Sequence, residues 1–257
     1  MDTKNLLSLK GKNGFVTGGA QGIGKAVAQA FAELGADLAI VDLNIQKAEA
    51  TAAEIGKATG RKVCAYECNV ADPASVKTMI AAYERDFNTV HFAVNNAGIF
   101  TGDPALEITP EAFKSVIDVN LNGVFFTAQA AAQLMVKHKN GGSIVSTASM
   151  SAHIINQPQT IANYCASKAA VVHLSKALAV EWAQYGIRVN TVSPGYIQTE
   201  LILSLKDMLP IWSGMMPKGT RLGVPEDLIG AFAYFVSDAS EYATGTDLII
   251  DGGYTTL

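Results

Sequence analysis

A tyrosine and a lysine stand four residues apart in the stretch Tyr164-Cys-Ala-Ser-Lys168. At that spacing both side chains lie on one face of a helix. A free phenol titrates near pH ~10, and a fixed ammonium group beside it favours the phenolate. Lowering the Tyr164 pKa by about three units would need roughly 4 kcal/mol of differential stabilisation. The pair is a candidate for general acid/base chemistry, although a half-buried tyrosine one turn from a solvated lysine is also a common structural arrangement.

A glycine-rich turn near the N-terminus follows an apolar run and precedes a helical pattern. Residues 12–17 predict a strand, and residues 18–24 follow with the spacing G-x-x-x-G-x-G. Apolar residues then recur at helical spacing from Ile23 to Leu34. Glycine lets the backbone approach a pyrophosphate, and the helix N-terminus offers free N–H groups. A strand, glycine turn and helix in this order favour a dinucleotide site over a simple tight turn.

An acidic residue ends the second predicted strand, residues 38–41. Asp42 lies 18 residues after Gly24, close to the ~20 expected for a carboxylate that holds the adenine ribose hydroxyls. Such a carboxylate repels a 2′-phosphate by roughly 4 kcal/mol per charge pair at contact. No Arg or Lys stands at Gln21, Leu43 or Asn44 to receive that phosphate. The sequence therefore predicts NAD as the cofactor, with NADP disfavoured.

The rest of the chain alternates strands with helices. Further strands are expected at 63–68, 90–94, 143–148, 188–193 and 248–250, and helices begin after Asp72, Thr109, Asn163 and Val224. This alternation predicts a single-domain α/β fold over residues 1–257, a Rossmann-like doubly wound parallel sheet. Ligands of such sheets bind at the carboxyl ends of the strands. Residues 196–224 are expected to form an irregular lid.

Composition excludes several classes of function. The 257 residues carry a net charge of −4, which argues against a nucleic-acid or anionic-membrane partner. No apolar run approaches the roughly 20 residues of a membrane span, and the first ten residues lack a signal-peptide core. The four histidines show no ligand spacing, so no metal is expected. We expect a cytoplasmic protein with a small-molecule substrate.

Taken together, the motifs resemble those of the short-chain dehydrogenase/reductase family. The matching pieces occur in the family's order along nearly the whole chain: the glycine motif 17–24, Asn95-Asn96-Ala97-Gly98, Asn120, Ser149, the Tyr164/Lys168 pair and Ser193-Pro194-Gly195. The resemblance implies a catalytic tetrad of Asn120, Ser149, Tyr164 and Lys168. Tyr164 would exchange a proton with the alcohol or carbonyl, Lys168 would lower its pKa, Ser149 would bind the reacting oxygen, and Asn120 would hold a relay water.

The position of the tetrad serine is where this chain departs from the family pattern. Family members usually place the serine 13 residues before the tyrosine, which would select Ser151. Counting from the strand residue Ile144 selects Ser149 instead, with two extra residues in the following loop. Because loops absorb insertions while strands keep their register, we expect Ser149 to be the catalytic serine.

The resemblance also implies a set of residues that bind the NAD cofactor. They come from the loops after successive strands: Gly18, Gln21, Gly22, Ile23, Gly24, Asp42, Leu43, Asn69, Val70, Asn96, Ala97, Gly98, Tyr164, Lys168, Pro194, Gly195, Ile197 and Thr199.

The stretch from Ser149 to Gln159, with Glu181-Trp-Ala and Pro194-Gly-Tyr196, is similar to the polyol dehydrogenase and ketose reductase branch of the family. We therefore expect hydride transfer between NAD and a secondary alcohol or ketone, such as sorbitol or mannitol and fructose. Several polar residues could bind the hydroxyls of the substrate: Ser149, His153, Asn156, Gln157, Tyr164 and Tyr196. They could equally be ordinary polar loop residues.

Alternative functions remain open at this point. A lid with Met208, Trp212, Met215 and Met216 would also suit an apolar ketone or a steroid. A 3-oxoacyl carrier-protein reductase generally prefers NADP and a basic surface, which the sequence does not favour. A cofactor-sensing or structural protein on the same fold would not need the tetrad. The resemblance further implies a homotetramer, with the helix 163–185 and the tail 251–257, including Tyr254, as assembly surfaces.

Overall fold

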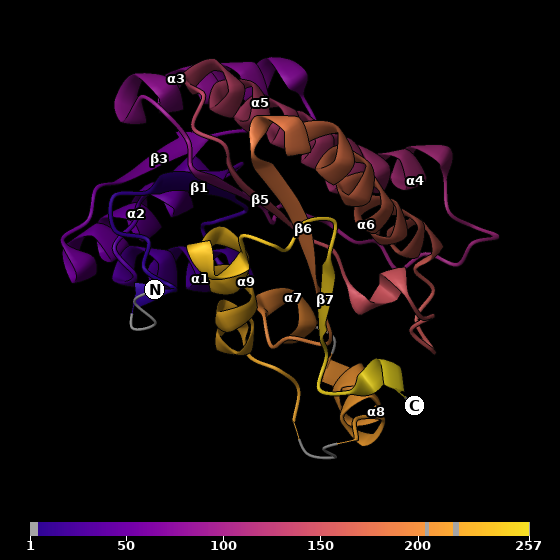
Figure 1. The fold of residues 1–257 in the computed structure, drawn as a ribbon. Coiled ribbons are helices and arrows are strands. Elements are labelled where there is room, and N and C mark those ends of the chain that lie inside the picture. Colours follow the sequence, from indigo (N-terminus) through magenta and orange to yellow (C-terminus); the bar gives the residue numbers. More distant parts are fainter. Residues whose placement is uncertain (1–4, 204–205, 218–220, 257) are drawn as a thin grey trace.

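One seven-stranded sheet forms the centre of the molecule (Figure 1). The structure is a computed structural model that describes residues 5–203, 206–217 and 221–256. All neighbouring strands are parallel, in the order β3-β2-β1-β4-β5-β6-β7. Their bounds are β1 Asn13–Thr17, β2 Asp37–Asp42, β3 Val63–Glu67, β4 Phe92–Asn95, β5 Gly142–Thr147, β6 Ile187–Pro194 and β7 Asp247–Ile250. The strand order reverses beside β1, which opens a crevice between the ends of β1 and β4.

The inner strands are apolar on both faces because helices cover both sides of the sheet. Along β1 and β2, Val16 and Ile40 belong to one buried cluster, and Phe15, Ala39 and Val41 belong to the other. This alternation follows from the two-residue period of a strand.

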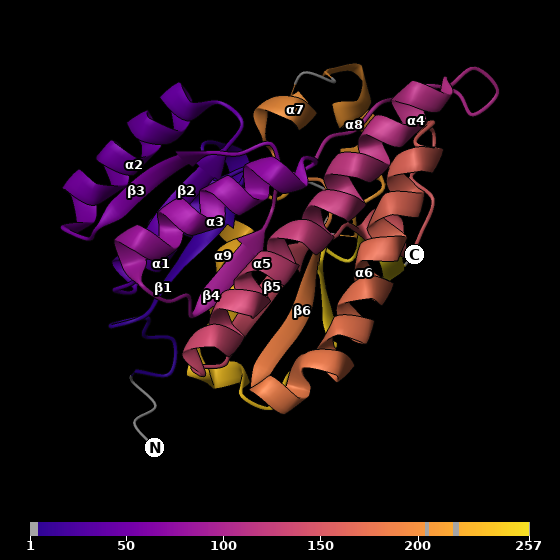
Figure 2. The same ribbon diagram turned by 90° about the horizontal axis from the view of Figure 1, so that it is seen from above.

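Helices form a layer on each face of the sheet, as Figure 2 shows from above. One buried cluster joins the sheet to α1 (Gly22–Glu33), α2 (Ile45–Thr59) and α9 (Ile229–Val236). The other joins it to α3 (Pro73–Phe87), α5 (Gly123–His138) and α6 (Ala162–Trp182). The α/β fold predicted from the sequence is confirmed.

The helix starts follow the expected capping chemistry. Asp72 is the N-cap of α3, and its side chain accepts a hydrogen bond from Ala74 N. Thr109 is the N-cap of the next helix, and its side chain accepts one from Ala112 N. A proline, Pro73 or Pro110, follows each cap. The helix that begins after Thr109 is long, and a π-helical turn at Asp118–Asn122 joins its two α-helical parts, α4 (Pro110–Ile117) and α5. Such turns occur frequently at functional sites.

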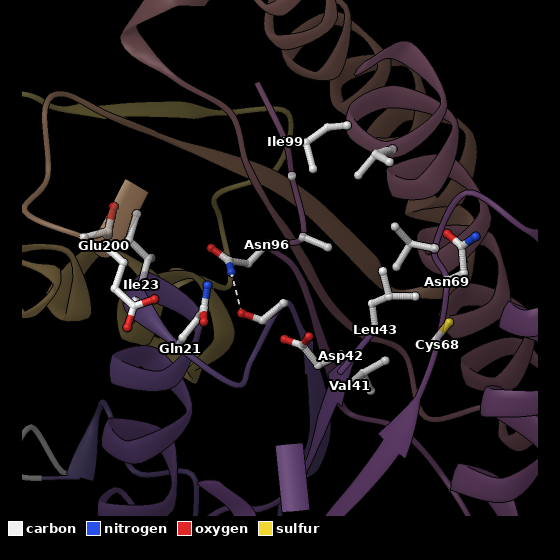
Figure 3. A pocket seen from close by; sticks show the side chains of 17 residues that line it. Gln21, Ile23, Val41, Asp42, Leu43, Cys68, Asn69, Asn96, Ile99 and Glu200 are labelled. Atoms are coloured by element: carbon white, nitrogen blue, oxygen red, sulfur yellow. Dashed lines mark hydrogen bonds between the residues drawn. The ribbon is translucent and has the colours of Figure 1, made fainter. Parts of the chain in front are cut away.

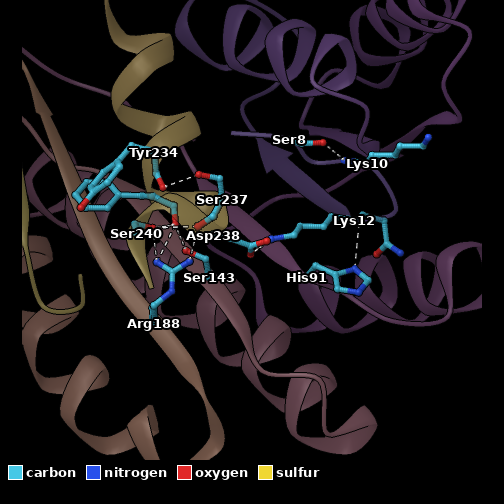
Figure 4. A network of polar contacts seen from close by, with 12 residues as sticks. Ser8, Lys10, Lys12, His91, Ser143, Arg188, Tyr234, Ser237, Asp238 and Ser240 are labelled. Atoms are coloured by element: carbon cyan, nitrogen blue, oxygen red, sulfur yellow. Dashed lines mark hydrogen bonds and ion pairs between the residues drawn. The ribbon is translucent and has the colours of Figure 1, made fainter. Parts of the chain in front are cut away.

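An arginine fixes the end of α9 to the sheet (Figure 4). Arg188 on β6 donates to the carbonyls of Phe235 at 2.9 Å and Ser237 at 3.2 Å and to the Ser240 hydroxyl at 2.7 Å. A guanidinium group at this position satisfies carbonyls that a helix leaves free at its C-terminus. The network is therefore structural and holds α9 against β5 and β6.

The segment after β6 is more regular than the sequence predicts. It contains α7 (Glu200–Leu203), a 3₁₀ turn at Lys206–Met208 and α8 (Leu209–Gly214). Trp212 of α8 is fully buried and stacks on Tyr196, with ring centroids 4.2 Å apart. Among the described residues, no helix combines the length and the apolar character that crossing a membrane requires.

Candidate active site

Two adjoining cavities open at the carboxyl ends of the strands. The first, of about 360 Å³, lies over β1, β2 and β4, and the second, of about 180 Å³, lies over β5 and β6. Both are lined by Ile23, Asn96, Gly98, Ile99 and Thr199, so a ligand in one lies next to a ligand in the other. We call them the cofactor cleft and the substrate cavity.

The glycine turn packs closely against neighbouring backbone at the cofactor cleft, whose lining side chains are shown in Figure 3. A Cβ at Gly18 would lie 2.9 Å from Ala97 Cα, and one at Gly24 would lie 2.1 Å from the Gly18 carbonyl oxygen. Gly18 and Gly22 also have φ angles of +59° and +55°, which side chains disfavour. The motif therefore needs glycine both for its conformation and for close packing, as a dinucleotide cradle requires.

Most of the residues predicted to bind the cofactor line the cleft. From the glycine turn to the loop after β6 they are Gly18, Gln21, Gly22, Ile23, Asp42, Leu43, Asn69, Val70, Asn96, Ala97, Gly98 and Thr199. Gly24 does not line it but packs α1 against the turn. The others line the substrate cavity next to it: Tyr164, Lys168, Pro194, Gly195 and Ile197. The donor set and the shape of this cleft fit a dinucleotide.

Asp42 holds two loops together at the edge of the cleft. Its carboxylate accepts hydrogen bonds from the backbone N–H of Ala20 at 3.2 Å and of Asn44 at 3.1 Å. Nearby, Lys47 Nζ lies 2.9 Å from Gln21 Oε1 and brings a positive charge to this edge. The sequence did not point to Lys47, because its contact with Gln21, 26 residues away, depends on the fold.

Tyr164 lies in the first turns of α6 and lines the substrate cavity. Burial raises the pKa of its phenol above the ordinary value, and a hydrogen bond with Ser149 opposes part of that rise. The expected lowering by Lys168 is not the dominant effect. The Lys168 ammonium lies 5.5 Å from the centre of the Tyr164 ring and donates to the Thr147 carbonyl at 2.7 Å, so it is not directed at the phenol oxygen.

Lys168 is itself almost completely buried. Burial lowers the pKa of its ammonium group to about 8, because desolvation disfavours the charged form. Lys168 and Asn120 both lie next to Gly98, because a Cβ on this glycine would lie 3.6 Å from Lys168 Nζ and 3.3 Å from Asn120 Oδ1. Gly98 therefore leaves space where the lysine and the amide approach the cofactor cleft.

Asn120 occupies the π-helical turn and is fully buried. Its Oδ1 accepts from Ile99 N at 2.8 Å, and its Nδ2 donates to the Ile99 carbonyl at 2.9 Å and to Ser167 Oγ at 3.1 Å. These contacts tie the loop after β4 to α6 and use both amide hydrogens. One lone pair of Oδ1 remains for a relay water.

Ser149 and Ser151 both line the substrate cavity. The Ser149 hydroxyl accepts from Ser151 N at 3.1 Å and lies 3.0 Å from Ser151 Oγ. Ser149 is the residue that is hydrogen-bonded to Tyr164. The strand register thus places Ser149 beside the tyrosine, with Ser151 as a second hydroxyl behind it.

The residues predicted to bind substrate divide into two groups. Ser149, Asn156, Tyr164 and Tyr196 line the substrate cavity, whereas His153 and Gln157 are exposed and do not. His153 Nε2 lies 2.7 Å from Asp247 Oδ2 on β7, which turns its ring away from the cavity. A polar residue in a loop has no periodic pattern that predicts its direction, so the sequence could not separate the two groups.

Other lining residues were not predicted. The cofactor cleft also contains Val41, Cys68, Ile99, Val119 and Glu200, and the substrate cavity also contains Phe100 and Ile161. Val41 and Cys68 lie at or just after strand ends, a signal that could have found them. Phe100 and Ile161 carry no such signal.

The whole chain is similar to known oxidoreductases in sequence and in fold. Residues 18–255 match the family model described as "Enoyl-(Acyl carrier protein) reductase". A short-chain type dehydrogenase/reductase from Mycobacterium marinum superposes with a TM-score of 0.96 at 46% identity, covering 99% of both chains. The chain belongs to the short-chain dehydrogenase/reductase family. It is an oxidoreductase of alcohol and carbonyl groups.

Curated relatives in this family are also similar over nearly their full length. A sorbose reductase of Candida albicans is 45% identical over 98% of this chain and 89% of its own. An NADP-dependent mannitol dehydrogenase of Alternaria alternata is 43% identical over 98% and 96%. Among solved structures, an NADPH-dependent 3-quinuclidinone reductase from Rhodotorula rubra has a TM-score of 0.93 at 38% identity, covering 98% of this chain and 94% of its own.

These comparisons contradict the preference for NAD drawn from Asp42, because similar proteins are named for NADP or NADPH. The structure supplies the physical reason. The Asp42 carboxylate already accepts two backbone N–H groups, which offset part of its charge, and the Lys47 ammonium contacts Gln21, which lines the cleft. The repulsion of a 2′-phosphate was therefore overestimated when Asp42 was considered alone.

Proposed function

We propose that this protein is an NADP(H)-dependent oxidoreductase that interconverts an acyclic ketose and the corresponding polyol. One observation carries the proposal: Tyr164 and Ser149 line a small cavity with polar groups that adjoins the cofactor cleft. The names of the similar sorbose reductase and mannitol dehydrogenase support this substrate class.

The proposed roles follow from the contacts of each side chain. Ser149 and Tyr164 bind the reacting oxygen, and Tyr164 exchanges the proton. Lys168 orients the nicotinamide ribose, and Asn120 holds a relay water next to Gly98. A bound nicotinamide supplies or accepts the hydride, and the protein supplies orientation and electrostatics.

The burial of Tyr164 favours the direction of carbonyl reduction at neutral pH. Its raised pKa keeps the phenol protonated, so the hydroxyl is ready to donate to a carbonyl oxygen. Alcohol oxidation needs the phenolate and should gain from higher pH.

We assign the 2′-phosphate of NADP(H) to the edge of the cleft between Gln21 and Lys47. Lys47 is the cation there, 2.9 Å from the Gln21 side chain, and it can leave that neutral partner for a phosphate at little cost. Asn44, the residue that caps α2, adds the N-terminal end of that helix.

The groups around the substrate cavity favour a neutral polyhydroxyl ligand. Among the described lining residues, Lys168 is the only ionised group, so a carboxylate substrate would find no arginine. The apolar lid residues that could suit a steroid do not line the cavity, and two of them, Trp212 and Met216, are buried with Tyr196 and Tyr254. The segment after β6 contributes to the wall of the cavity, which supports its role as a lid. Its lining residues are Tyr196, Ile197, Thr199 and Ile202.

The decisive experiment measures NADPH oxidation with a panel of carbonyl compounds. We expect activity with D-fructose or L-sorbose, and NADP reduction with mannitol or sorbitol. The panel includes 2,3-butanedione, a 3-oxoacyl thioester and a ketosteroid. Activity confined to these last three would reject the ketose assignment and leave the oxidoreductase assignment intact.

A further inference from the structure

We propose that the amide oxygen of Asn156 accepts a hydrogen bond from a substrate hydroxyl other than the one at the reacting carbon. This inference rests on the proposed ketose and polyol function and names the residue that would select for it. The supporting observations are the burial of Asn156, its unpartnered Oδ1 atom and the hydrogen bonds that fix its amide.

Asn156 is buried although it is polar and lies in a surface loop. Asn156 is 2% exposed, whereas the adjacent Ile155 is 71% exposed and Gln157 is also exposed. Burying an amide while exposing an isoleucine costs free energy unless the amide makes its hydrogen bonds. The loop is therefore built to place this amide beside the cavity, which Asn156 lines.

A short chain of hydrogen bonds holds the amide but leaves its oxygen free. Asn156 Nδ2 donates to the Tyr196 hydroxyl at 3.2 Å, and that hydroxyl donates its proton to Gln159 Oε1 at 2.8 Å. The Tyr196 proton is therefore already used. Asn156 Oδ1 is buried without a partner, and a buried amide oxygen in that state lacks a hydrogen bond it would normally make.

The support for Tyr196 makes this group rigid. Its ring stacks on Trp212 at 4.2 Å between centroids and meets the Tyr254 ring edge-on at 5.4 Å. The backbone N–H of Gln159 also donates to the Asn156 carbonyl at 2.7 Å, which closes the loop on itself. A preorganised acceptor binds its donor without the loss of conformational entropy that ordering the loop would require.

A hydroxyl is the donor that this environment fits. The lining around Asn156, Gln159 and Tyr196 is uncharged, so an ammonium group would lack a counter-ion there. Ser149 and Tyr164 serve the reacting oxygen, which leaves Asn156 for another position along a polyhydroxyl chain. A plain ketone has no donor and would leave the amide oxygen unsatisfied, so the site discriminates against it.

The test uses two six-carbon substrates with the carbonyl at carbon 2, D-fructose and 2-hexanone. Asn156→Leu keeps the side-chain size and removes the acceptor. We expect kcat/KM for fructose relative to 2-hexanone to fall roughly 10–100-fold, mainly through the fructose KM. Gln157→Leu, on the exposed neighbouring residue, is the matched control and should leave this ratio unchanged.

Tyr196→Phe is the second variant and removes only the hydroxyl that holds Asn156. It should lower the same ratio to a smaller extent, and it decides the case if Asn156→Leu does not fold. A wild type that reduces fructose, with variants that lower both activities equally, would overturn the role of Asn156 alone. A wild type that reduces 2-hexanone but no ketose would reject the proposed function, and this inference with it.

Discussion

At the scale of single residues, the Tyr164 phenol is the group on which the proposed chemistry depends. It is partly buried, lines the substrate cavity and is hydrogen-bonded to Ser149. Tyr164→Phe keeps the ring and removes the proton carrier, so we expect kcat to fall by roughly 10²–10⁴-fold. NADPH affinity, measured by fluorescence titration, should change little. Tyr185→Phe, in the 3₁₀ turn that follows the same helix, is the control, and near-normal turnover by Tyr164→Phe would exclude the mechanism.

The buried Lys168 ammonium group lowers the free energy of unfolding by an amount that depends on pH. Its folded pKa of about 8 lies below the ordinary value of 10.5, so the unfolded chain holds the proton more tightly. Below pH ~8 Lys168 is protonated in both the folded and the unfolded chain, and the destabilisation caused by its burial is constant. Between pH ~8 and ~10.5 the folded chain loses this proton while the unfolded chain keeps it, so the destabilisation decreases. Wild-type stability should therefore rise relative to Lys168→Met across that window.

Urea unfolding of both proteins at several pH values between 7 and 10 measures this effect. We expect the difference in unfolding free energy to shift toward the wild type by up to about 1.4 kcal/mol per pH unit. Lys176→Met, on the exposed side of the same helix, serves as the comparison. A difference that stays constant from pH 7 to 10 would show that the buried ammonium is not destabilised.

At the scale of elements, we propose that the N-terminus of α2 and the turn after β1 together set cofactor preference. Lys47 lies in the first turn of α2 and reaches across to Gln21. Removing it in Lys47→Ala takes away one charged hydrogen bond to a 2′-phosphate, so the Kd for NADPH should rise about tenfold while that for NADH stays similar. Isothermal titration of both cofactors tests this.

The matched control is Lys57→Ala, because Lys57 lies in the last turn of the same helix. It should alter neither affinity. Equal loss of NADPH and NADH binding in Lys47→Ala would indicate a general effect on the turn and would remove Lys47 from cofactor selection.

The sequence predicted the strands well because each is a short apolar run bounded by turn residues. The expected run 63–68, for example, corresponds to β3 at Val63–Glu67. It did not predict the π-helical turn at Asp118–Asn122, since one extra residue in a helix leaves no compositional sign. The helices α7 and α8 were also missed, because their apolar residues pack on the C-terminal segment.

The site was predictable where residues follow a strand or a helical period. Gly18, Asp42, Asn96 and Ser149 lie near strand ends, and Tyr164 and Lys168 share a helix face, so topology brings them together. Side chains in the loop after Ser149 follow neither rule. Their directions depend on contacts with β6 and β7, which the sequence does not encode locally.

At the scale of the whole molecule, we propose assembly into a homotetramer through the outer face of α6. Val180 on this helix is 80% exposed, and small exposed residues at 166, 169 and 177 continue the same face. Figure 2 shows α6 at the border of its layer, beside α5. Tyr254 does not contribute as expected, because it is buried against Tyr196 within its own chain.

Sedimentation at micromolar concentration should give the mass of four chains, and Val180→Glu should give smaller species. Ala81→Glu, which adds a carboxylate at an exposed position of α3, distinguishes a local clash from a general charge effect. A wild type that sediments as a monomer would reject the proposed assembly.

Because Tyr196 stacks on Trp212, we expect substrate binding to change the fluorescence of Trp212. Tyr196 lines the substrate cavity, while Trp212 lies behind it, fully buried and outside the cavity. A ligand that polarises the Tyr196 hydroxyl through Asn156 alters the surroundings of the indole without touching it. The chain has two tryptophans, and in a Trp182→Phe background the emission of Trp212 would report occupancy of the cavity. Ketose binding could then be followed in the absence of turnover, with no added label.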